Sequence, residues 1–227
     1  MTEKKKHKYR MNKNEAYYQE QYGHLPSTKS ELIEYVKENC KIDYDKYASL
    51  KNHITTMPIE KIHIELFIIP KPSPRPRYSS KTDSFYVKGA AFNKKSIESL
   101  LDEYNIIFTS TNILIRTYQP TPVRAMKPHE VLLAEEGLIR ASTNPDFDNL
   151  AKTYTDMLQE TLLLNDNLIT IGTVEKYYSI RPRVEIEIEY QSTFDCEYNR
   201  KRTVNSKKFY AMVDEDTYEA MSKLRIS

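Results

Sequence analysis

One amphipathic helix constrains the fold of this chain more than any other stretch. Leu150, Tyr154, Met157, Leu158 and Leu162 recur at helical spacing, so they form one continuous apolar face. A helix with such a face is stable only when the face packs against another element. Because strand-like patterns lie on either side of it in the sequence, we predict that this helix packs against a sheet.

Alternation of apolar and other residues predicts the strands of that sheet. It is clearest over residues 62–69 and 183–190, and residues 113–118 and 168–177 complete four predicted strands. The glutamates within 183–190 alternate with apolar residues, so we expect them on a solvated face and not as ligands. The mixture of strand and helix patterns predicts an α/β (α+β) fold, a single domain with a mixed sheet flanked by helices.

Both ends of the chain extend beyond this domain, which we place at residues 58–190. Residues 1–57 are predicted to form a basic tail and a helical extension, with a capping box at Thr28-x-x-Glu31. Residues 191–227 are predicted to form a basic loop followed by a C-terminal helix that begins near Asp214.

Composition excludes several classes of protein. With 4 Gly among 227 residues, the chain has no glycine-rich phosphate loop. Cys40 and Cys196 are isolated, which favours free thiols. No stretch approaches about 18 apolar residues, so we expect neither a signal peptide nor a membrane span, and a cytoplasmic location. The formal net charge of +2 says little, but residues 71–95 are locally basic and contain one acid, Asp83.

Carboxylates gather around the start of the amphipathic helix. Asp146 and Asp148 flank its start, and Asp148 is the expected N-cap. Asp166 follows the helix, where a helix–turn–strand hairpin would return it beside the other two. Three carboxylates suit a hard cation such as Mg²⁺, and Lys152 would neutralise charge building on a phosphorus. The same residues could instead be turn residues, a helix cap and a surface ion pair.

A basic, proline-rich segment follows the first predicted strand. Its prolines cannot continue a central strand, and they would hold arginines outward, where guanidinium groups bind phosphate well. Arg181 and Arg183 at a later turn are further candidates for phosphate contact. Ordinary surface arginines are the alternative in both places. The residues predicted to contact DNA are Lys71, Arg75, Arg77 and Lys81.

Taken together, these motifs resemble the RusA-type Holliday junction resolvases. The run Asp146-x-Asp148-Asn149-Leu150-x-Lys152, with Asn165-Asp166 before a strand, is similar to the core motif of that family. The basic segment and the closing strand match in the same order, so the resemblance covers about residues 62–95 and 144–190. The chain departs from the family in having Asn144-Pro145 before the first aspartate and Asn165 in place of the first acid of a doublet.

The resemblance implies a specific activity. In that family the carboxylates matching Asp146, Asp148 and Asp166 bind Mg²⁺, the lysine matching Lys152 is essential, and a homodimer cuts two strands of a four-way DNA junction. We therefore expect a nuclease domain at 58–190 that hydrolyses branched DNA with Mg²⁺, or with Mn²⁺ as an alternative. Two other classes stay open: a nucleic-acid-binding protein without catalysis, and a glycosyltransferase whose Asp-x-Asp pair holds a metal.

Overall fold

The chain folds into two compact units, Met1–Lys51 and Asn52–Ser227. The computed structural model describes residues 13–23, 28–72, 76–79, 84–87, 101, 104–159 and 161–226. The predicted domain boundaries after residues 57 and 190 stay predictions. No helix within these described ranges combines the length and the apolar character that crossing a membrane requires.

The first unit is helical, as predicted. It contains α1 (Lys13–Tyr22) and α2 (Lys29–Asn39), and α3 (Tyr44–Thr56) continues from it into the second unit. The capping box is confirmed: the Thr28 hydroxyl accepts from the backbone N–H of Glu31 at 3.3 Å, and the Glu31 carboxylate accepts from that of Thr28 at 3.1 Å. This reciprocal pairing satisfies two N–H groups at the start of α2 and fixes where that helix begins.

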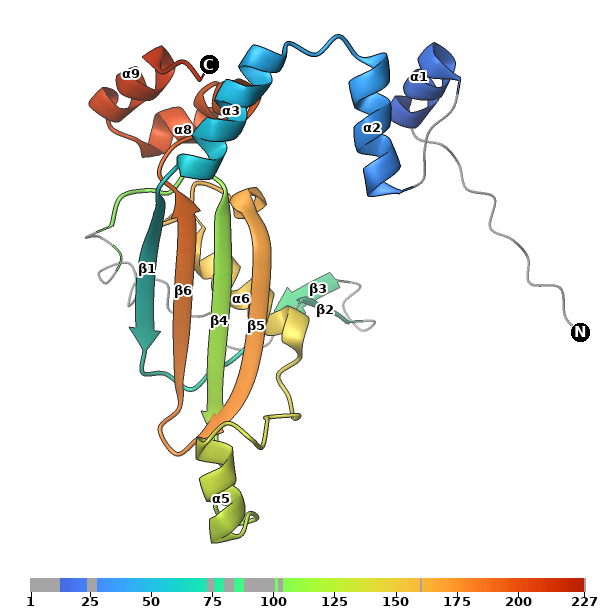
Figure 1. Cartoon of the computed structure of the whole chain (residues 1–227). Helices are drawn as coiled ribbons and strands as arrows, with labels where there is room; N and C mark the ends of the chain where they lie inside the picture. Colours follow the sequence, from blue (N-terminus) through green and yellow to red (C-terminus); the bar gives the residue numbers. More distant parts are fainter. Residues whose placement is uncertain are drawn as a thin grey trace, which may run out of the picture. The chain divides into compact units, whose positions relative to one another are not determined.

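Four strands form one mixed sheet in the second unit (Figure 1). Their order is β1-β6-β4-β5, in which β4 pairs parallel with β5 and antiparallel with β6, and β1 pairs antiparallel with β6. All four predicted strands are confirmed. They are β1 (Ile59–Leu66), β4 (Thr111–Pro120), β5 (Ile169–Ser179) and β6 (Arg183–Gln191).

The amphipathic helix, α6 (Phe147–Leu158), packs against this sheet as predicted (Figure 1). Leu150, Tyr154 and Leu158 are 0% exposed and share one hydrophobic cluster with Ile115 of β4 and Ile186 of β6. The expectation that Asp148 caps the helix is wrong. The helix begins two residues earlier than expected, and Asp146 occupies the N-cap position with extended backbone.

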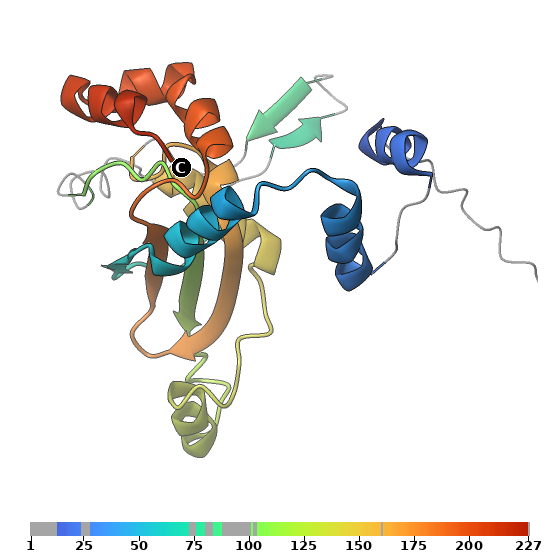
Figure 2. The same cartoon turned by 45° about the horizontal axis from the view of Figure 1, so that its top comes forward.

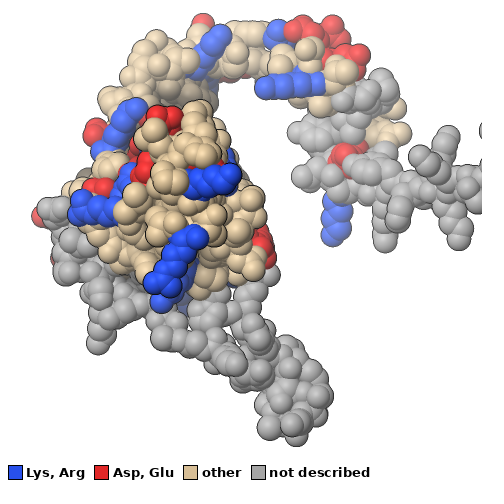
Figure 3. Space-filling view, turned by 90° about the horizontal axis from the view of Figure 1, so that it is seen from below, with Lys and Arg blue, Asp and Glu red and all other residues tan. Residues whose placement is uncertain are grey.

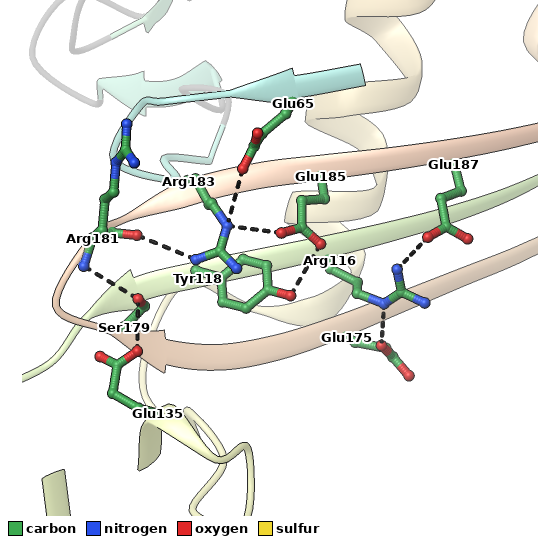
Figure 4. A network of polar contacts seen from close by, with 10 residues as sticks. All are labelled: Glu65, Arg116, Tyr118, Glu135, Glu175, Ser179, Arg181, Arg183, Glu185 and Glu187. Atoms are coloured by element: carbon green, nitrogen blue, oxygen red, sulfur yellow. Dashed lines mark hydrogen bonds and ion pairs between the residues drawn. The ribbon is translucent and has the colours of Figure 1, made fainter. Parts of the chain in front are cut away.

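The opposite face of the sheet carries a network of charged side chains (Figure 4). Arg116 of β4 bridges two strands, since its guanidinium reaches Glu175 of β5 at 3.1 Å and Glu187 of β6 at 2.5 Å. Lys61 of β1 pairs with Glu189 of β6 at 2.5 Å. The glutamates of β6 therefore lie on the polar face, as predicted, but they are ion-paired across strands.

The segment after β6 differs most from expectation. The C-terminal helix is confirmed as α9 (Glu215–Lys223), but the predicted basic loop contains two further helices, α7 (Glu197–Val204) and α8 (Lys207–Met212) (Figure 2). Arg200 of α7 connects this helix to α9. Its guanidinium is buried, donates to both oxygens of Glu197, and also donates to the carbonyl groups of Met221 and Ser222 in α9.

Three shorter features complete the unit. A two-stranded ribbon contains β2 (Pro76–Ser79) and β3 (Ser84–Val87). The short helix α5 (Pro128–Glu135) follows β4, and Gly137 comes after it with a positive φ of 75°. Before β4, Ile107 forms a single bridge with Leu163.

Candidate nuclease site

The start of α6 holds the first group of predicted site residues. Asp146 lies at the N-cap and its side chain makes no capping hydrogen bond, while Asp148 lies in the first turn. Both carboxylates are exposed, and so is Lys152 one turn further along the helix. Negative groups are favoured at this end of a helix because the backbone N–H groups point toward them. The structure thus places two carboxylates and one ammonium group on an accessible surface.

A lysine that the sequence reasoning missed supports the loop leading to this helix. The Lys176 ammonium group of β5 donates to the carbonyl oxygens of Thr143 at 2.5 Å and Pro145 at 2.7 Å. The Asn144–Pro145 peptide is cis. Alternation along β5 is the signal that could have identified Lys176, since it places this residue on the face of Val174, toward α6, and opposite to Glu175.

Asp166 lies apart from the other two aspartates. It begins the short 3-10 helix η1 (Asp166–Leu168), immediately before the first residue of β5. Lys176, which contacts the loop before Asp146, stands seven residues along that strand from Ile169, about 23 Å at a rise of ~3.3 Å per residue. The expected hairpin that returns Asp166 beside Asp146 therefore does not form. The loop before α6 lies beside the second half of β5, whereas Asp166 precedes the first residue of that strand.

This separation bears on the predicted metal site. Within the described residues, no group of three His, Cys, Asp or Glu side chains is arranged to hold a metal ion. The pair Asp146 and Asp148 offers carboxylate oxygens alone, which suits a hard cation that takes its other ligands from water and substrate phosphate. The ligand roles of Asp146, Asp148 and Asp166, and the role of Lys152, stay predictions.

The predicted DNA-binding segment begins beside α6. Lys71 is exposed, and its backbone interacts with the hydroxyl of Tyr154, which lies on the buried face of the helix. Burial raises the pKa of that hydroxyl, and the nearby backbone of Lys71 opposes the rise. Arg77 falls in β2, where its side chain is not described, and Arg75 and Lys81 lie outside the described residues. Their contact with DNA stays a prediction.

Arg183, a candidate for phosphate contact, is instead engaged within the sheet (Figure 4). Its guanidinium lies 2.7 Å from Glu185 and 3.4 Å from Glu65, and its central carbon lies 3.5 Å from the centre of the Tyr118 ring. The Tyr118 hydroxyl donates to Glu185 at 3.0 Å. The pKa of Tyr118 is raised, mainly by burial and to a smaller extent by this hydrogen bond. Arg181 similarly lies over the ring of Phe67 at 3.8 Å.

Charges of both signs are dispersed over the surface seen in Figure 3. In the part of this face that the structure describes, Lys and Arg lie among Asp and Glu on a largely uncharged surface. A uniform basic field is therefore absent from the described part of this face. On this face, attraction for DNA would come from local groups of cations.

The part of the chain that matches known proteins contains α6, β4, β5 and most of β6, but not β1. The family model described as "Endodeoxyribonuclease RusA" matches residues 68–189, which include Asp146, Asp148, Lys152 and Asp166 but exclude the first unit and α7 to α9. A curated relative, the uncharacterized protein YqaN of Bacillus subtilis (strain 168), is 31% identical over 123 residues, covering 50% of this chain and 85% of YqaN. Since the family model spans more than half of the sequence, this chain belongs to the RusA endodeoxyribonuclease family.

Proposed function

We propose that this chain is a metal-dependent endodeoxyribonuclease that cuts branched DNA, with four-way junctions as the expected substrate. The observation that carries the proposal is the exposed position of Asp146 and Asp148 at the start of α6, inside the residues that the family model matches. Exposed carboxylates can reach a phosphodiester in a duplex, whereas buried ones would require the site to open.

The carboxylate pair fits a magnesium ion. Mg²⁺ is usually held by one or two carboxylates and completes its shell with water and substrate phosphate, and Mn²⁺ prefers the same oxygen ligands. Asp146 and Asp148 would hold the ion, and its chemistry there would be to lower the pKa of a water molecule and to offset charge on the leaving oxygen of the phosphodiester. Asp166 would join this site only after a rearrangement or from another copy of the chain.

The chain's own residues supply the remaining roles. Lys152 places an exposed ammonium group one turn from Asp148, where it would stabilise negative charge developing on the phosphoryl oxygens. Lys176 holds the carbonyl groups of Thr143 and Pro145 and so fixes the approach to Asp146. Lys71, at the start of the basic segment, would attract the phosphates of the bound strand.

Cleavage of a synthetic four-way junction tests the proposal. The wild type should cut in Mg²⁺ and stop cutting in EDTA. Asp146→Asn and Asp148→Asn keep the side-chain shape but remove the charged ligand, so each should lower the cutting rate at least about a hundredfold while binding to the junction is retained. The matched control is Asp216→Asn, which changes an exposed acid in the first turn of α9 and should leave cutting unchanged.

The outcomes separate the alternatives. A wild type that binds the junction but never cuts it, with any divalent cation, would support a nucleic-acid-binding protein without catalysis. Aspartate variants that cut at the wild-type rate would show that these residues are turn and cap residues only. Either result would end the nuclease proposal.

A further inference from the structure

A cavity of about 560 Å³ lies between the sheet and the C-terminal helices. Leu164, Phe194 and Phe108 contribute apolar surface to it, and the first two of these side chains are buried in the cluster that holds Phe209 of α8. The turn that contains Asp166 forms part of its wall, because Asn165 and Asn167 line it on either side of that residue. The volume is typical of sites that take a small ligand or one residue of a polymer.

The polar lining is rich in cations and in neutral hydrogen-bonding groups. Arg202 of α7 and Lys207 of α8 line it and are exposed, and Lys208 joins them. Among the described lining residues Asp195 is the one acid, and its carboxylate accepts from the Asn199 amide at 2.8 Å. Three cations against one acid give the cavity a local positive charge, in contrast to the mixed charges of Figure 3.

We propose that this cavity binds a nucleotide of a DNA strand, as a second DNA contact separate from the start of α6. The phosphate would lie against Arg202 and Lys207, since cations at a cavity mouth attract phosphate groups. Amides such as Asn165 and Asn167 can donate to and accept from the sugar or base edge, and the apolar floor suits the face of a base. The choice of nucleic acid as the ligand rests on the proposed function.

The position of the cavity gives it a defined part in substrate binding. Arg202, Lys207 and Lys208 lie outside residues 68–189, so the C-terminal helices contribute a contact that the family match does not include. A strand held there would pass beside Asp166, at the opposite end of β5 from the loop before Asp146. The cavity would thus hold DNA away from the cutting site and add to the affinity for substrates long enough to reach both places.

Binding measured in EDTA tests this inference without involving cleavage. We would compare Arg202→Ala/Lys207→Ala with the control Lys201→Ala/Lys223→Ala, which removes equal charge from two exposed lysines that pair with Glu197 and Glu219. Fluorescence anisotropy with a labelled single-stranded oligonucleotide and with a four-way junction would be recorded at several salt concentrations. Thermal unfolding would verify that both variants are folded, as expected for exposed positions.

The expected loss follows from counterion release. Each lost phosphate contact lowers the slope of log affinity against log salt by about 0.7 to 0.9, so losing two contacts weakens binding roughly 25- to 60-fold at ~0.1 M salt relative to 1 M. The cavity variant should therefore lose affinity by at least about tenfold at ~0.1 M salt and show a shallower slope. The control should stay within about twofold of the wild type.

Four results would overturn the inference. Equal losses in the two double variants would mean that net charge matters and the cavity does not. A cavity variant with wild-type affinity, in a protein that binds and cuts junctions, would refute the cavity site and leave the proposed nuclease intact. A deoxynucleoside monophosphate that binds the wild type but not the cavity variant, while oligonucleotide binding is equal in both, would assign the cavity to a free nucleotide. A wild type that binds no DNA would refute both proposals together.

Discussion

Lys176 is the residue on which the position of Asp146 depends most directly. Its two hydrogen bonds, to the carbonyl oxygens of Thr143 and Pro145, connect the edge strand of the sheet to the loop before α6. The side chain does not have to touch DNA to matter, because a displacement of a reacting group by about 1 Å can cost about a hundredfold in rate. We regard Lys176 as a positioning residue.

Replacing Lys176 by Met should remove both hydrogen bonds while keeping most of the side-chain volume. We expect the cutting rate to fall by about tenfold to a hundredfold, and more Mg²⁺ to be needed for half-maximal cutting, since the carboxylate pair is less well placed. Titration of Mg²⁺ in single-turnover cleavage of a junction measures both effects. Lys176→Arg, which can still donate to the two carbonyl groups, should recover part of the rate; equal rates for Met and wild type would remove Lys176 from the site.

Lys152 should behave differently from Lys176. Lys152→Ala removes a cation proposed to stabilise charge in the transition state, so cutting at saturating Mg²⁺ should fall by about a hundredfold. The Mg²⁺ concentration for half-maximal cutting should stay close to that of the wild type, because the two carboxylates are untouched. A variant that loses affinity for the junction in proportion to its loss of rate would indicate that Lys152 only binds DNA.

At the scale of elements, the salt bridge between Glu197 and Arg200 belongs to the contact between two C-terminal helices, α7 and α9. Arg200 donates to Glu197 and to carbonyl groups at the end of α9, so one buried guanidinium connects α7 to α9. The hydrogen bond from Arg200 lowers the pKa of the Glu197 carboxyl from 4.5 to about 2. A lowered pKa in the folded state stabilises that state above the ordinary pKa of the group.

This linkage predicts how acid affects the C-terminal helices. The contribution of Glu197 is fully present above about pH 4.5 and is lost as the pH falls toward about 2, where the folded carboxyl takes up its proton. Wild type should therefore resist urea better than Glu197→Gln at pH 6, and the difference should close between pH 4.5 and 2. Urea midpoints at a series of pH values measure it, and a constant difference across that range would contradict the linkage.

The second stabilising feature of these helices is Phe209. It is 0% exposed, and its ring lies 5.3 Å from that of Phe108 in an edge-to-face arrangement. Phe209→Ala should lower the free energy of unfolding by about 3–5 kcal/mol, the usual result of removing a buried aromatic ring. Tyr210→Ala is the matched control next to it, since Tyr210 is 72% exposed and contacts only the edge of Tyr218 among the described rings; it should cost about 1 kcal/mol.

Periodicity explains which elements could be predicted. β1, β4, β6 and α6 each bury several side chains at regular spacing, so their apolar patterns identify them. By contrast, α7 buries only Arg200 and Val204 and α8 only Phe209, and so few buried positions give no detectable period. The place of Asp166 was mispredicted for another reason: periodicity defines α6 and β5 but not which end of one lies beside the other.

At the scale of the whole molecule, the two faces of the sheet have separate roles. One face packs on α6 through apolar side chains, which fixes the helix whose first turn carries the carboxylates. The other face carries cross-strand ion pairs centred on Arg116 and Arg183 (Figure 4). Because those arginines are engaged with glutamates, DNA affinity is expected to come from the basic segment and the cavity beside α8.

The last prediction concerns how many copies of the chain act on one junction. The RusA family implies a homodimer, and a two-fold dimer carries two identical sites that can cut two strands of a symmetric junction. A heterodimer purified through two different tags, with one wild-type subunit and one Asp146→Asn subunit, should cut only one strand. On a plasmid that extrudes a cruciform it should yield nicked circles, whereas the wild-type dimer should yield linear molecules.

Light scattering should give twice the 26.8 kDa mass of the chain. A monomeric mass together with paired cuts, or linear products from the heterodimer, would show that one site cuts both strands in turn.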